Sequence, residues 1–436
     1  MNPQPARKQG WRRAWAWQVG CCCGMAVAGI QSAQGQEALR SAISVDRSVK
    51  VRPLRPDYVK PAGTYFGPVQ FSKGLYSEVG YDSNVNLSER DPQSDVYFRN
   101  GFRIGLHWPV TVRSELRFGT EVGYIHYLDR GRNSGFEVAP DSTLAYTFSF
   151  DELRVTLFDQ FNYLQQARTE AALVNIATLS RLENSAGIRF SWEPNQFIFQ
   201  FGYSHHNTAS DEETYEYINR SSEYLFGRAG MRLAEATEAG IEASVDFSSY
   251  EFSVQNDQDT VSVGAYVEWQ LMEHLRVMAR GGPTISKFHN RVTTGNDDGG
   301  LNSHYYGFEV AQQLTQFMSH KVGLTREVRA GLSEGSAYIE QLTGSYSFYW
   351  SPTRWLTIGM GLAYEDGQQP LPFFVNGVRG EIVEKFNRFV AHPTISCRLT
   401  DSFTATLAYI HAIRDTNLNQ RNYRNHLVSL NLAYSF

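Results

Sequence analysis

The sequence predicts an all-β fold: a transmembrane, antiparallel, up-and-down β-barrel of about 18 strands. Three observations lead to this prediction. Apolar and polar residues alternate in segments of about ten residues, the connections between these segments alternate in length, and the chain ends on an aromatic residue, Phe436. Alternation with a period of two indicates a strand whose two faces meet different surroundings. Short turns at one end and long loops at the other are typical of outer-membrane barrels.

The composition favours membrane-spanning strands over membrane-spanning helices. Of the 436 residues, 42% are hydrophobic, and the mean hydropathy is −0.38. The chain is nevertheless rich in aromatic residues and glycine, with 24 Tyr, 27 Phe and 36 Gly. Only every second residue of a barrel strand faces lipid, so hydropathy stays modest. The net charge of −5 gives no reason to expect a nucleic-acid partner.

The first 72 residues are predicted to precede the barrel. Residues 1–35 combine a basic start, an apolar core and a small-residue end, which predicts a secretory signal peptide. Residues 36–72 contain four prolines and too few apolar residues for a core, so we expect a periplasmic N-terminal extension. The barrel itself is predicted to span residues 73–436. Once the signal peptide is removed only Cys397 remains, so no disulfide is expected within the mature chain.

The connections set the strand number. Eight short turns alternate with nine longer loops, which gives 18 strands and places both termini on one side, predicted to be the periplasm. The short turns are expected near residues 108–110, 150–151, 193–195, 234–236, 272–274, 316–318, 351–353 and 400–401. The loops are expected near residues 84–95, 128–136, 164–179, 208–220, 250–258, 288–302, 332–336, 366–381 and 415–422.

The side-chain pattern assigns the two faces of the wall. In each predicted strand one face is apolar and the other polar, as expected for lipid outside and water inside. A soluble barrel with the opposite sense would show the same period, but a ring of this size could not fill its own centre with side chains. Tyr434 and Phe436 are expected to close the ring against the first strand. Tryptophans near the short turns predict an interfacial girdle: Trp108, Trp192, Trp269, Trp350 and Trp355.

Two charged residues do not fit this assignment simply. Asp159 and Arg326 fall on the lipid face of their predicted strands. Either a β-bulge shifts the phase there, or both residues lie near the outer rim, where a charge costs about 0–1 kcal/mol.

The polar face predicts a charged lumen, and two interpretations are open. The charges are either solvated and paired with one another, for example Arg103 with Glu115, or the arginines form a ladder that guides an anionic sugar polymer. In the second case Tyr266 and Tyr305 would offer stacking faces. The predicted lumen residues are Arg99, Arg103, Arg117, Arg154, Arg189, Arg228, Arg276, Arg280, Arg388, Arg398, Glu121, Glu242, Glu268 and Tyr266.

No enzyme active site, metal site or cofactor is expected. His205 and His206 precede a run of acidic residues that could hold a metal, but a solvated loop explains them more simply. The sequence contains no Ser/His or Asp/His set at a spacing typical of a hydrolase.

Residues 67–71 (GPVQF) and 81–87 (YDSNVNL), with the polar loop that follows, resemble the second-type β-barrel porin family. The specific residues are confined to the first strand and its loop, while the architectural likeness covers residues 67 to 436. The resemblance implies an outer-membrane barrel, and some family members belong to exopolysaccharide export clusters. Asp82 and Asn84 are expected to bond local backbone amides at the end of the strand.

Together these features favour an outer-membrane channel that exports a secreted polysaccharide with a periplasmic or inner-membrane partner. The alternatives are a general diffusion porin for small solutes and a non-channel surface barrel with a hydrolase or adhesion role. The other expected partners are outer-membrane lipid and the outer-membrane assembly machinery, which would recognise the C-terminal strand.

Overall fold

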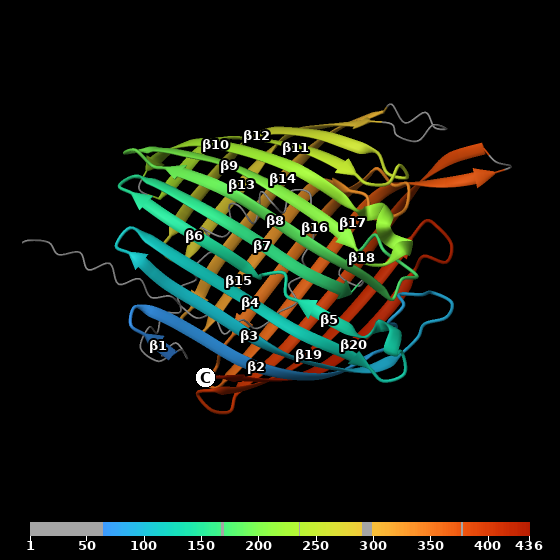
Figure 1. Ribbon diagram of the computed structural model, residues 1–436, viewed down its shortest axis with the longest axis horizontal. Helices are drawn as coiled ribbons and strands as arrows, with labels where there is room; N and C mark the ends of the chain where they lie inside the picture. The colour runs from blue at the N-terminus through green and yellow to red at the C-terminus, as the bar shows by residue number, and fades with distance from the viewer. Residues whose placement is uncertain (1–63, 167–169, 235, 290–298, 376–377) are drawn as a thin grey trace, which may run out of the picture.

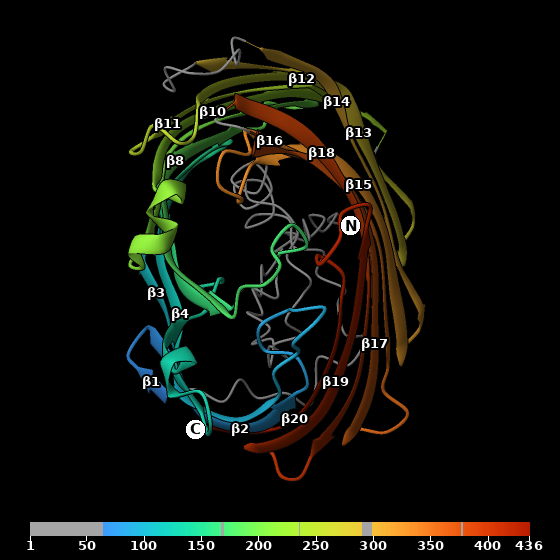
Figure 2. The same ribbon diagram turned by 90° about the vertical axis from the view of Figure 1, so that its right-hand side faces the viewer.

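The computed structural model describes residues 64–166, 170–234, 236–289, 299–375 and 378–436. Their strands form one antiparallel sheet that closes on itself, seen from the side in Figure 1 and along its axis in Figure 2. The ring closes between the C-terminal strand and β2. Leu75 lies opposite Tyr434, and the Phe436 N–H donates to the Lys73 carbonyl oxygen at 3.0 Å.

Eighteen strands make up the ring, as predicted. β5 and β6 both pair with β4 and β7 and form one interrupted strand, and the short β1 pairs only with the start of β2. The strands are β1 (Thr64–Phe66), β2 (Val69–Asp82), β3 (Asp95–Thr111), β4 (Ser114–Tyr127), β5 (Gly135–Val138), β6 (Thr143–Phe150), β7 (Leu153–Gln166), β8 (Thr178–Trp192), β9 (Phe197–Ser210) and β10 (Arg220–Ala234). They continue as β11 (Thr237–Tyr250), β12 (Asp257–Met272), β13 (Leu275–His289), β14 (Gly300–Thr315), β15 (Met318–Ala330), β16 (Tyr338–Trp350), β17 (Leu356–Val375), β18 (Val378–Arg398), β19 (Phe403–Thr416) and β20 (Tyr423–Ser435). In the loops of the described ranges lie the 3-10 helices η1 (Gly131–Asn133) and η3 (Glu213–Ile218).

The two faces of the wall differ as the alternation predicts. In β20, Val428 and Leu430 are exposed, whereas Asn425 and Ser429 are buried. The exposed residues of neighbouring strands are likewise apolar, and the residues between them are mostly polar. Apolar side chains outside and polar side chains inside a closed ring are the arrangement of an outer-membrane barrel, so the chain belongs in an outer membrane.

The eight short turns lie at one rim, called the short-turn end, and the longer loops lie at the other, called the long-loop end. The loop predicted at 366–381 is wrong, because β17 and β18 continue there as a paired hairpin that projects beyond the ring (Figure 1). This part of β17 contains Pro370 and Pro372. Beyond Gln368 β17 no longer pairs with β16, so this stretch is an edge strand, which tolerates proline.

The N-terminal boundary differs slightly from the predicted one. β1 and the start of β2 lie within the predicted extension 36–72, so strand pairing begins before residue 73. The predicted signal peptide (1–35) and the rest of that extension, to residue 63, lie outside the described residues. Among the helices that the structure describes, none has the length and apolar character needed to cross a membrane.

The outer wall carries the predicted girdle near the short-turn end. Trp108, Trp192, Trp269, Trp350 and Trp355 are all exposed, as is Phe436. Asp159 and Arg326 do face outward, and each has a polar partner on the same face. Asn184 Nδ2 donates to Asp159 Oδ1 at 2.6 Å, and Arg326 pairs with Glu340 at 3.0 Å. No bulge is needed to explain them.

The assignment of faces can be tested on adjacent residues of β20. Leu430→Arg places a charge on the lipid face and is expected to lower the unfolding free energy by about 2–4 kcal/mol. Asn431→Arg places the same group on the inner face, where the native amide lies 3.4 Å from Glu78, and is expected to change stability by less than about 1 kcal/mol. Urea unfolding in lipid vesicles would measure both, and equal losses would contradict the assignment.

Candidate functional site

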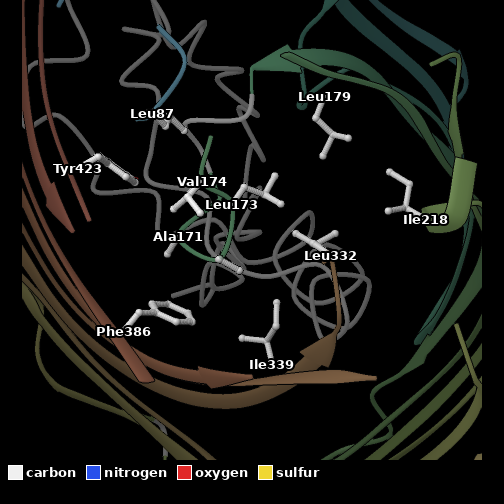
Figure 3. Close-up of a cluster of buried hydrophobic side chains, with 11 residues drawn as sticks. Leu87, Ala171, Leu173, Val174, Leu179, Ile218, Leu332, Ile339, Phe386 and Tyr423 are labelled. Carbon is white, nitrogen blue, oxygen red and sulfur yellow. The ribbon is translucent and has the colours of Figure 1, made fainter. Parts of the chain in front are cut away.

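The lumen is crossed by a segment of the connection between β7 and β8. This inward segment (residues 170–177) lies inside the ring rather than above it (Figures 2 and 3). Glu170, Ala171 and Leu173 are 3%, 2% and 2% exposed. A loop buried this deeply needs partners on the wall for its charge and its backbone, and the structure supplies both.

The carboxylate of Glu170 joins two distant parts of the wall. It accepts from Arg181 NH2 on β8 at 3.0 Å and from Arg329 NH2 on β15 at 2.9 Å. These strands lie seven positions apart in the ring, so the two ion pairs span the lumen. All three side chains are nearly inaccessible, which makes each pair a buried one.

Backbone carbonyls of the inward segment bind the wall formed by β17–β19 and the loop after β19. Arg414 Nε donates to the Ala171 oxygen at 2.7 Å, and Gln369 Nε2 and Arg421 NH2 both lie 3.4 Å from the Ala172 oxygen. Glu384 orients these donors. It accepts from Arg414 at 2.8 Å, from Arg421 at 2.8 Å and from Gln369 at 2.8 Å.

An apolar cluster completes the anchoring. Ala171, Leu173 and Val174 lie in the middle of side chains contributed by the wall and by other loops (Figure 3). The partners include Leu87, Ile218, Leu332, Ile339, Phe386 and Tyr423. The first loop is tied to the inward segment by its backbone as well, since Asn175 N–H donates to the Leu87 oxygen at 3.2 Å.

The sequence motif around Asp82 and Asn84 fixes that first loop. Asn84 N–H donates to Asp82 Oδ1, and Ser88 N–H donates to Asn84 Oδ1, both at 3.0 Å, which confirms the predicted bonds to local backbone amides. The motif also reaches the last strand, because Asn425 Nδ2 donates to Asp82 Oδ1 at 2.9 Å. The conformation of the loop and the closure of the ring therefore share the same side chains.

Several predicted lumen arginines are ion-paired on the inner face. Arg99 lies 3.0 Å from Glu137, Arg117 lies 2.8 Å from Glu115, and Arg388 lies 2.5 Å from Glu365. The suggested pairing of Arg103 with Glu115 is wrong. Arg103 binds Glu121, which lies directly opposite it on β4, whereas Glu115 is opposite Pro109 near the turn.

Arg228 is the centre of a buried group of such pairs. It lies 3.0 Å from Glu242 and 2.9 Å from Glu268, and its guanidinium stacks 3.7 Å from the centre of the Tyr266 ring. Arg276 binds the other oxygen of Glu268. Tyr266 is 3% exposed, so its ring serves Arg228 and offers no stacking face to a solute.

The remaining predicted arginines also belong to the inner face of their strands. Arg189 lies with its guanidinium over the Phe158 ring at 5.5 Å. Arg154 lies opposite Ser191, and Arg280 lies opposite Tyr266. Arg398 is exposed at the short-turn end of β18. That any of these arginines guides a solute stays a prediction.

The residues that hold the inward segment were not singled out from the sequence. Alternation places Arg181, Arg329 and Arg414 on the inner face, but Glu170 sits in a connection without periodicity. His205 and His206 separate onto opposite faces, and His205 Nδ1 lies 2.8 Å from Glu223 on the outer wall. In the described ranges no group of three or more His, Cys, Asp or Glu could hold a metal ion.

No family model and no curated protein matches the chain. Among solved structures, Pseudomonas aeruginosa OccK5 (OpdH) is 11% identical with a TM-score of 0.43, covering 84% of this chain and 98% of that chain. Acinetobacter baumannii OccAB3 is 9% identical with a TM-score of 0.45, covering 84% and 99%. The Pseudomonas aeruginosa outer membrane protein opdK is 10% identical with a TM-score of 0.44, also covering 84% and 99%. Because these sequence identities are so low, the function of this chain has to be inferred from the geometry of its own barrel.

Glu170→Gln tests the anchoring of the inward segment. The change removes the charge that two buried arginines require, and breaking a buried pair costs about 3–5 kcal/mol. Amide hydrogen exchange at residues 170–174 is therefore expected to accelerate more than about tenfold, since 1.4 kcal/mol is a factor of ten. Glu309→Gln is the control, because Glu309 pairs with Lys321 in a half-exposed site away from the segment. Unchanged exchange in Glu170→Gln would show that other contacts suffice.

The same anchor predicts a pH dependence. Burial disfavours the Glu170 carboxylate, but attraction to Arg329 and Arg181 outweighs burial and the neighbouring Glu183, so the pKa of Glu170 lies below its ordinary value. A lowered pKa means that the anchor is complete above the ordinary carboxyl pKa of about 4.3 and is lost as the pH falls through the lower folded pKa. The protection of the amides of residues 170–174, meaning the slowing of their exchange relative to an unstructured chain at the same pH, should stay high from pH 7 to pH 5 and fall in stronger acid. Glu170→Gln should remove this dependence.

Proposed function

We propose that the protein is a constricted diffusion porin for small solutes. The observation that carries this proposal is the inward segment, which narrows a lumen otherwise wide enough for an aqueous channel in an 18-stranded ring. The constriction lies in the half of the barrel toward the long-loop end. Toward the short-turn end the paired side chains are more accessible: Arg103 and Lys321, for example, are 33% and 51% exposed.

The charges of the inner face support passage of small solutes over guidance of a polyanion. A ladder for a carboxylate-bearing polymer needs guanidinium groups that are available to the polymer. In Arg99, Arg228 and Arg388 these groups already bind glutamates, in sites that are largely buried. This arrangement corresponds to the first interpretation of the lumen, in which the charges pair with one another.

Export of a polysaccharide, the function favoured by the resemblance to the second-type porins, has less support. A polymer would have to displace the inward segment, together with the Glu170 ion pairs and the apolar cluster around Leu173. A periplasmic or inner-membrane export partner likewise stays a prediction of the sequence. The non-channel barrel with a hydrolase or adhesion role has no specific observation in its favour.

Conductance in planar bilayers tests the proposal. The refolded barrel is expected to give a small, steady current, and replacing residues 170–174 by glycine and serine is expected to raise it severalfold, because the constriction then loses its anchors. The same replacement at residues 131–133 is the control, since η1 contains no buried residue.

Added anionic polysaccharide separates the alternatives. The current of a small-solute porin should be indifferent to the polymer. A block that Arg103→Ala with Arg280→Ala relieves would instead favour export. Absence of current in both the native barrel and the 170–174 replacement would exclude a channel.

A further inference from the structure

The outer wall carries a hollow that the proposed function does not use. It lies over β8–β12 and has a volume of about 510 Å³. The exposed side chains that line it are apolar. They include Phe190, Trp192, Phe201, Ile241, Ala243 and Val263.

Strand register explains the shape of the hollow. One row of directly opposite residues crosses five strands: Phe190, Phe201, Gly227, Ala243 and Val263. The next row toward the short-turn end contains Trp192, Phe199, Ala229 and Ile241. Large aromatic residues on β8 and β9 thus stand beside the smallest residues on β10, and branched residues on β11 and β12 form the other side.

Gly227 forms the floor. A Cβ atom built at this position would meet nothing within 4 Å, so no neighbour requires a glycine there. Nor does the backbone, because the positive-φ glycines in the described chain are Gly67 and Gly335. Glycine weakens a strand and often marks a place where a ligand approaches the backbone closely. At Gly227 its effect is to leave the hollow open.

We propose that this hollow binds one acyl chain of a phospholipid. The site is continuous with the lipid-facing band of the wall and is lined by hydrocarbon. Its volume is more than three times that of an engineered apolar cavity of about 150 Å³ that holds benzene. The chain enters from the leaflet at the short-turn end, where Trp192 belongs to the girdle.

A polar group marks the other end of the hollow. Glu223, four residues before Gly227 on β10, accepts from Tyr203 at 2.5 Å and is bonded to His205 at 2.8 Å. This cluster ends the apolar path toward the long-loop end. A second copy of the chain fits less well. A barrel wall is convex, and an approaching barrel would meet the prominent Ile241, which is 65% exposed, before it reached the floor at Gly227.

Gly227→Phe fills the hollow, and Gly344→Phe is a matched control. Gly344 also lies mid-strand on the outer face, and a Cβ there would meet only the Tyr364 oxygen at 3.9 Å and Leu324 Cδ1 at 4.0 Å. The full barrel is reconstituted with a defined phosphatidylethanolamine and phosphatidylglycerol mixture and then released from detergent for native mass spectrometry. We expect one retained lipid in the native protein and in Gly344→Phe, and at least a tenfold lower occupancy in Gly227→Phe.

A second measurement locates the lipid and does not depend on retention in detergent. Phe199 is replaced by the photo-reactive p-benzoylphenylalanine, and lipid adducts are counted by intact mass after irradiation in the bilayer. Adducts should fall severalfold on adding Gly227→Phe but not on adding Gly344→Phe. Ala243→Phe provides a second filling variant, and heat-dependent gel mobility confirms that each barrel is folded.

Two outcomes would overturn the proposal. Equal adduct yields with and without Gly227→Phe would mean that Phe199 meets only the ordinary lipid surrounding the barrel. Cross-links to a second copy of the chain would identify this wall as an interface between barrels.

Discussion

The structure depends on one constraint: in hydrocarbon every backbone N–H and C=O needs a partner within the protein. A sheet meets this requirement only when it has no edge. Pairing of β2 with β20 removes the edge, and the motif at Asp82 and Asn84 ties the same two strands together beyond the last ladder bonds. Closure then fixes the alternation of every strand, because one face of each must meet lipid and the other the lumen.

Closure at 18 strands creates a second problem, since the ring is too wide for its own side chains to fill. The inner wall is polar because water reaches it. Many of its charged side chains nevertheless pair so closely that they shield one another from water. Arg228 with Glu242 and Glu268 is such a group. Where the inward segment enters, chain takes up part of the space that water would otherwise occupy, and the buried charge of Glu170 needs the two arginines that span the lumen.

The sequence predicted what depends on local pattern: the strand number, the faces, the turns and the tryptophan girdle. It missed what depends on contacts between distant residues. Glu170 and Arg329 are 159 positions apart, and Ala171 and Arg414 are 243 positions apart. Alternation assigns a residue to a face but not to a partner, which is why Arg103 was matched with Glu115 and not with Glu121. The β17–β18 hairpin was missed as well; beyond Gln368 β17 pairs only with β18, outside the ring whose strands the alternation predicted.

The anchoring of the inward segment bears on the choice between porin and polymer conduit. Two buried ion pairs hold Glu170, and breaking one such pair costs about 3–5 kcal/mol. The carbonyl bonds from Arg414 and the apolar cluster around Leu173 would be lost as well. A polymer conduit would need a source of free energy for each opening, such as a partner that binds the open state more tightly. A small solute would need none, because it would pass beside a segment that stays in place.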